Sequence, residues 1–187
     1  MDLFQRQEQL HCEAKAILFE RGVVSVIESY GEIDLTGSYG LKTMYKKDID
    51  ISLCNEALSY EAFFQLGAKL ATLLKPHGLF GRNTKVRSVE NRPPDGYYWG
   101  FQFEDWKMDL WNIPRYHLDE SRQYAQDILN HMTEDKRLTI LEIKAAASSS
   151  YNRGYSSKEV YQAVIYEQVD SVEAFAEWLH RVKGLRM

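Results

Sequence analysis

Two aspartates inside an apolar segment are the residues of this chain best suited to chemistry. Asp48 and Asp50 alternate with isoleucines in the sequence DIDISL, residues 48–53. Aspartate is depleted in strands, whereas isoleucine favours them. In an extended strand both carboxylates point to one face, with their Cα atoms about 7 Å apart. Such a pair repels itself unless a cation lies between the two groups, and carboxylate oxygens suit Mg²⁺ or Mn²⁺. The pair therefore indicates one half of a metal and nucleotide site.

A glycine-serine turn precedes these aspartates. The sequence EIDLT, residues 32–36, predicts a short strand that leads directly into Gly37 and Ser38. Glycine permits a tight turn with close backbone approach, and serine supplies a hydroxyl and a helix N-cap beside exposed backbone amides that suit phosphate oxygens. Lys46 and Lys47 come just before Asp48. They either neutralise triphosphate charge or form a solvated turn, and the sequence does not separate these two interpretations.

This arrangement resembles the nucleotidyltransferase superfamily, which includes DNA polymerase beta and the small antibiotic nucleotidyltransferases. The family's signature is an apolar strand, Gly-Ser, a short helix, an acidic-apolar-acidic strand and a third carboxylate on a later strand. The resemblance covers roughly residues 23–113, and Asp109, inside the apolar sequence WKMDLWNI, is the candidate for the third carboxylate. Many members carry a small residue and an arginine after Gly-Ser, where this chain has YGLK. Phosphate contacts beyond Ser38 are therefore not carried over.

The resemblance implies an Mg²⁺-dependent nucleotidyltransferase, with Mn²⁺ as a substitute ion. It would move a nucleoside monophosphate from a nucleoside triphosphate such as ATP to an acceptor hydroxyl and release pyrophosphate. The predicted site consists of the catalytic and metal-binding carboxylates Asp48, Asp50 and Asp109 and the nucleotide-binding residues Gly37, Ser38, Lys46 and Lys47. Asp109 would complete a second metal position or act as general base, and Glu142 is another candidate for the base. Without the upstream motif, Asp109 would instead be a partly exposed acid paired with Lys107 or Arg115.

The acceptor is open at this level. The size of the chain and its helical second half resemble the small antibiotic-modifying members of the superfamily, which implies a small hydroxylated acceptor similar to an aminoglycoside or a lincosamide. One alternative is a protein nucleotidyltransferase or antitoxin that acts on a partner protein. Another is a nucleotide-binding module without catalysis, against which the presence of all three acids argues.

Composition restricts the class of protein further. The 187 residues include 27 acidic and 23 basic side chains, for a net charge of −4, so a broad basic surface for duplex nucleic acid is not expected. The two cysteines, Cys12 and Cys54, have no metal-ligand spacing, which favours a reduced intracellular protein over a disulfide scaffold. The sequence begins MDLFQR, without a basic and then apolar leader, and no apolar run approaches a membrane span. We therefore expect a cytoplasmic protein.

The elements that must position the site predict an α+β fold: a nucleotidyltransferase-like mixed sheet with flanking helices in residues 1–114, and a helical bundle in residues 115–187. Predicted strands are 32–36, 48–53, 84–90, 97–103 and 106–113, with a turn at 92–96. Predicted helices are 2–20, 23–30, 59–74, 117–131, 134–148 and two more that begin after Ser156 and Asp170, each with a capping box. Glu142, Lys144, Arg153 and Tyr155 are interpreted as solvated surface residues, with lining of an acceptor pocket as the alternative.

Overall fold

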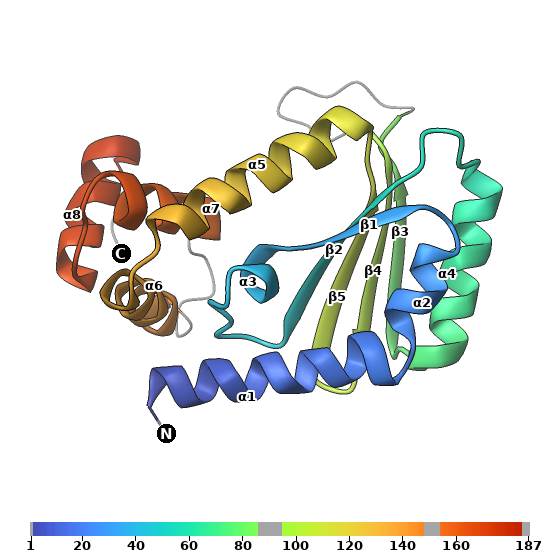
Figure 1. Ribbon diagram of the computed structural model, residues 1–187, viewed down its shortest axis with the longest axis horizontal. Helices are drawn as coiled ribbons and strands as arrows, with labels where there is room; N and C mark the ends of the chain where they lie inside the picture. The colour runs from blue at the N-terminus through green and yellow to red at the C-terminus, as the bar shows by residue number, and fades with distance from the viewer. Residues whose placement is uncertain (1, 86–94, 148–153, 185–187) are drawn as a thin grey trace.

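A five-stranded mixed sheet forms the centre of the computed structural model, which describes residues 2–85, 95–147 and 154–184 (Figure 1). The strand order is β1-β2-β5-β4-β3. β2 and β5 are parallel, and the other neighbouring pairs are antiparallel. The strands are β1 (Glu32–Thr36), β2 (Asp48–Cys54), β3 (Gly78–Asn83), β4 (Tyr97–Phe103) and β5 (Trp106–Asn112). The mixed sheet and its helices confirm the predicted α+β class.

Helices cover the sheet on one face and extend from it at the C-terminal end of the chain. The N-terminal half contains α1 (Leu3–Lys15), the π-helical turn η1 (Ala16–Glu20), α2 (Val23–Glu28), α3 (Gly37–Gly40) and α4 (Tyr60–Leu74). The C-terminal part contains α5 (Arg115–His131), α6 (Glu134–Ala146), α7 (Ser157–Tyr161), the π-helical turn η3 (Gln162–Tyr166) and α8 (Val172–Lys183). Among the helices that the structure describes, none is long and apolar enough to cross a membrane.

Strand alternation separates a buried face of the sheet from an open one. Ile49, Ile51 and Leu53 of β2 are at most 1% exposed, as are Met108 and Leu110 of β5. They pack with α2 and α4 in one hydrophobic core, as expected for a sheet with one solvated face. The residues that alternate with them along the two strands, including the three aspartates, point to the opposite face. Ordinary burial of isoleucine, leucine and methionine thus presents the acids to the open side.

The C-terminal helices form a second hydrophobic cluster, which includes Phe175 and Trp178 of α8 and reaches Leu41 just after α3. Helix α5 runs from the sheet to these helices (Figure 1). Its residues Arg115 and Arg122 both pair with Glu32 at the start of β1. The predicted boundary between residues 114 and 115 falls at the start of α5, and the division into two domains there stays a prediction.

The strand predicted at 84–90 is wrong where the structure describes it. The strand is β3, which ends at Asn83, and residues 86–90 lie outside the described part of the chain. The Thr84 side chain instead accepts a hydrogen bond at Oγ1 from the Gly96 N–H at 2.9 Å. Glycines normally argue against a strand, but here Gly81 makes room for a neighbouring ring: a Cβ on it would lie 2.7 Å from Trp99.

Two further predictions on the C-terminal helices have mixed outcomes. The capping box of Ser156 with Glu159 is confirmed. The one predicted at Asp170 is wrong by one residue, because Ser171 is the N-cap of α8 and accepts a hydrogen bond from the Ala174 N–H. Most of the predicted turn at 92–96 lies outside the described residues, as does Arg153, interpreted above as a solvated residue.

Candidate active site

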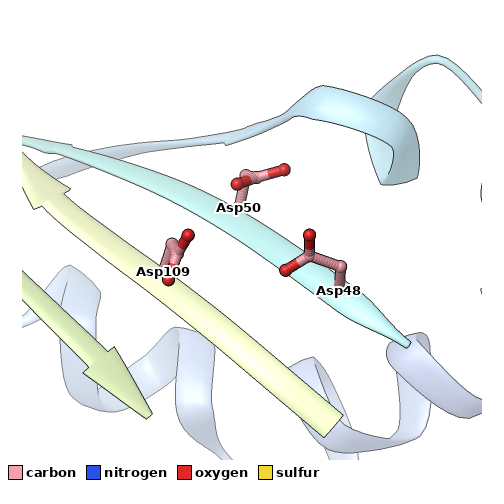
Figure 2. A group of neighbouring side chains, drawn as sticks. All are labelled: Asp48, Asp50 and Asp109. Atoms are coloured by element: carbon pink, nitrogen blue, oxygen red, sulfur yellow. The ribbon is translucent and has the colours of Figure 1, made fainter. Parts of the chain in front are cut away.

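The parallel pairing of β2 with β5 brings the three predicted carboxylates together. Asp50 lies opposite Asp109 in this pairing, and Asp48 lies opposite Lys107. One oxygen atom from each of Asp48, Asp50 and Asp109 lies within 4.8 Å of the others. Figure 2 shows the three side chains on the same side of the two strands. This acidic triad has the hard oxygen ligands that Mg²⁺ prefers.

Burial and mutual repulsion raise the pKa values of two of the three acids, and nearby lysines offset this rise only in part. Burial, followed by the charges of Asp48 and Asp109, raises the pKa of Asp50 to about 7. Burial also raises the pKa of Asp48, and the Lys107 ammonium opposes this rise. Although the Asp48 side chain is 40% exposed, its Oδ1 atom is buried and accepts no hydrogen bond from the described residues. The Lys107 ammonium lies 3.7 Å from this oxygen, at ion-pair rather than hydrogen-bond distance, so a carboxylate oxygen without a hydrogen bond beside two more acids fits a divalent cation.

Gly37 packs directly against this site. Its φ angle of +66° lies in the left-handed region that favours glycine, and a Cβ there would lie 2.4 Å from Asp50 Oδ2. The turn therefore requires glycine for its backbone angle and for its approach to the carboxylate. Ser38 follows on α3, and its carbonyl accepts a hydrogen bond from the Thr43 N–H at 2.9 Å. The predicted nucleotide-binding turn thus lies beside the predicted metal ligands.

Asp109 is held by two side chains that the sequence analysis did not assign to the site. The Tyr98 hydroxyl donates to its Oδ1 at 2.7 Å, and Lys107 Nζ donates to its Oδ2 at 2.6 Å. Burial, followed by the Asp109 hydrogen bond, raises the pKa of Tyr98 to about 12. Burial lowers the pKa of Lys107, but its bond to Asp109 and the nearby Asp48 charge raise it overall. Lys107 precedes Asp109 by two residues, so strand alternation alone signals that both share a face.

The two lysines before Asp48 lie differently. Lys47 Nζ contacts Glu13 and Asp105, each at 2.9 Å, so its charge is engaged by acids outside the triad. The Lys46 charge lowers the pKa of Asp48, by less than burial raises it. Lys46 thus acts on the triad electrostatically, and the predicted role of both lysines in nucleotide binding stays a prediction.

Lys144 is buried, so its interpretation as a solvated residue is wrong. It is 7% exposed, and its Nζ donates to the Thr43 carbonyl at 3.0 Å and to the Tyr161 hydroxyl at 2.9 Å. These bonds join α6 and α7 to the segment that follows α3, because that segment offers oxygens to a buried cation. Glu142 is partly buried on α6, and the choice between Asp109 and Glu142 as general base stays a prediction.

Comparison with known proteins bears on the fold. No family model matches the sequence, and no curated protein sequence matches it. Among solved structures, the polymerase core of TRAMP, an RNA surveillance complex, is similar with a TM-score of 0.56 over 84% of this chain, at 14% identity. The chain has the nucleotidyltransferase fold. It spans 49% of the length of the TRAMP polymerase chain, and at this identity the similarity concerns the fold alone.

Within the nucleotidyltransferase fold, the local motifs and the tertiary arrangement agree. The glycine-serine turn lies beside the Asp-Ile-Asp strand β2. The third acid, Asp109, lies on β5, which pairs with β2. The fold predicted from the resemblance is thereby confirmed.

Proposed function

We propose that this protein is an Mg²⁺-dependent nucleotidyltransferase that moves a nucleoside monophosphate from a nucleoside triphosphate to a hydroxyl of a small acceptor. The observation that carries the proposal is the acidic triad: three carboxylates from two parallel strands, with one oxygen of each within 4.8 Å of the others. Structural acids on neighbouring strands would be separated or individually paired, because clustered like charges destabilise a fold. Retention of such a cluster beside Gly37 favours a site that binds a cation.

The residues have distinct roles in this reaction. The acceptor oxygen attacks the α-phosphorus, the bond from that phosphorus to the bridging oxygen of the β-phosphate breaks, and pyrophosphate leaves with the bond electrons. Asp109 takes the proton of the acceptor hydroxyl, oriented by Tyr98 and Lys107. Asp48 and Asp50 would hold Mg²⁺, which when bound neutralises charge on the triphosphate. Gly37 and Ser38 place the turn where the phosphates would lie.

A hollow beside Asp109 suits the acceptor. Its volume is about 370 Å³, within the usual range for small-molecule pockets. Two of its lining residues, Tyr98 and Lys107, also bind Asp109, and Phe80 offers an aromatic ring that is 52% exposed. Among the described residues, the hollow is lined by Gly78, Leu79, Phe80, Tyr98, Gly100, Phe101, Gln102 and Lys107. An acceptor with an apolar face would stack there with its hydroxyl directed toward Asp109.

Calorimetric titration of ATP, GTP, CTP and UTP, with and without Mg²⁺, tests the proposal. We expect binding of at least one nucleotide that requires Mg²⁺ and is lost in the double variant Asp48→Asn with Asp50→Asn. Asp119→Asn, an exposed acid on α5, is the matched control and should bind as the wild type does. The donor identified in this way would then enter an acceptor screen read by pyrophosphate release.

Two outcomes would contradict the proposal. Nucleotide binding that is unchanged by the double variant would remove the triad from the site. Binding with full metal dependence, but with turnover only when a protein acceptor is supplied, would favour the protein nucleotidyltransferase over the small-molecule enzyme.

A further inference from the structure

Lys107 lies beside the acidic triad on the same face of the sheet. In the parallel pairing of β2 with β5, Asp48 lies opposite Lys107 and Asp50 lies opposite Asp109. Four side chains on one face thus form a square with three carboxylates and one ammonium. The Lys107 Nζ lies 2.6 Å from Asp109 Oδ2 and 3.7 Å from Asp48 Oδ1. The strand register places Lys107 beside two of the acids, and its half-exposed side chain directs the ammonium between them.

Two other lysines near the triad make their contacts elsewhere. Lys144 lowers the pKa of Asp50 through its charge, but its hydrogen bonds go to Thr43 and Tyr161. Lys47 is paired with Glu13 and Asp105. Lys107, by contrast, donates a hydrogen bond directly to a triad carboxylate, Asp109 Oδ2, at 2.6 Å.

Charge and space both limit how many metal ions fit beside Lys107. Three ionised carboxylates carry three negative charges, which the Lys107 ammonium and a single divalent ion would together neutralise. In sites with two ions, the ions lie about 3.5 to 4 Å apart and share carboxylate ligands. A second ion bridging Asp48 and Asp109 would need the oxygens that the ammonium already contacts. Like charges at that distance repel strongly in a partly buried site.

We propose that Lys107 is a resident cation of this site: the triad holds one divalent ion between Asp48 and Asp50, and the Lys107 ammonium takes the place of a second ion between Asp48 and Asp109. The inference rests on the proposed function for the reaction it serves, but it concerns the number of metal ions. Each Asp109 oxygen already accepts one hydrogen bond, Oδ1 from Tyr98 and Oδ2 from Lys107, so the acceptor proton would go to a remaining lone pair of this carboxylate. The ammonium lies where it stabilises negative charge on the attacking oxygen.

Counting bound Mn²⁺ by electron paramagnetic resonance tests the inference without any turnover. We expect one Mn²⁺ per chain in the wild type and in Lys107→Arg, which keeps the charge. Lys107→Met should bind two, with at least tenfold tighter binding of the first, and the two ions should show magnetic coupling. Lys69→Met, on α4 of the other face of the sheet, is the control for loss of a lysine and should bind one. Thermal unfolding of each variant checks that it is folded.

The outcomes separate this inference from the proposed function. Two Mn²⁺ ions in the wild type, or one in a folded Lys107→Met or Lys107→Gln, overturn the resident cation and leave the nucleotidyltransferase proposal standing. If the wild type shows no Mn²⁺ binding that is lost in Asp50→Asn, the triad is not a metal site. That result overturns both proposals. A wild-type count of two Mn²⁺ ions overturns the inference even when a lysine variant does not fold.

Discussion

The ionised Asp50 carboxylate lowers the free energy of unfolding of the metal-free protein. Its pKa rises from 3.8 to about 7 on folding, mainly because it is buried and then because Asp48 and Asp109 are nearby. A carboxyl group whose pKa is raised in the folded state binds its proton more tightly there than in the unfolded chain. The cost to stability is therefore absent below about pH 4, grows between about pH 4 and 7, and is complete above about pH 7.

The magnitude follows from that difference in pKa. At about 1.36 kcal/mol for each pH unit, the rise from 3.8 to about 7 corresponds to about 4 kcal/mol. Asp50 is only partly buried, and solvent screening reduces this figure to about 2 to 4 kcal/mol. Asp50→Asn keeps the shape of the side chain and removes its charge. We expect this variant to be more stable than the wild type by that amount at pH 8.5, and by less than half of it at pH 5.

Urea unfolding in the presence of a chelator measures this gain at both pH values. Asp119→Asn, which removes an exposed acid, should change the free energy of unfolding by less than about 0.5 kcal/mol at either pH. Adding Mg²⁺ at pH 8.5 should raise the stability of the wild type and leave Asp50→Asn unchanged, because a ligand stabilises only a state that binds it. A variant that is no more stable than the wild type at pH 8.5, or whose gain does not grow with pH, would refute this reasoning.

Three substitutions test other parts of the site. Gly37→Ala should weaken Mn²⁺ binding at least tenfold, because the new Cβ would lie 2.4 Å from an Asp50 oxygen. Gly22→Ala is the control: Gly22 also has a positive φ, +82°, but no atom lies within 4 Å of a Cβ there. This variant introduces only backbone strain and should bind Mn²⁺ normally. Tyr98→Phe should lower the turnover rate about tenfold, since it removes a donor from the proposed base, and a lost fold on circular dichroism would count against that role. Tyr161→Phe should cost about 1 to 2 kcal/mol in urea unfolding, because two buried polar groups lose a partner; an unchanged midpoint would contradict this.

The sequence by itself determined the local chemistry. Alternation along a strand places Asp48 and Asp50 on one face whatever the rest of the chain does, and the Gly-Ser turn needs only short-range steric rules. The apolar setting of Asp109 and the N-cap serines and threonines of the helices are equally local signals. These features were enough to predict the α+β class, and their resemblance to the nucleotidyltransferase superfamily supplied the expected fold and the third acid.

Only the tertiary structure decided which residues meet. The parallel register that sets Asp50 opposite Asp109 joins strands far apart in the sequence, and pairing between distant strands is not encoded in local propensity. The burial of Lys144 and the binding of Asp109 by Tyr98 and Lys107 depend on it in the same way. The raised pKa of Asp50 is also a property of the assembled site, because burial and neighbouring charge exist only once the strands have paired.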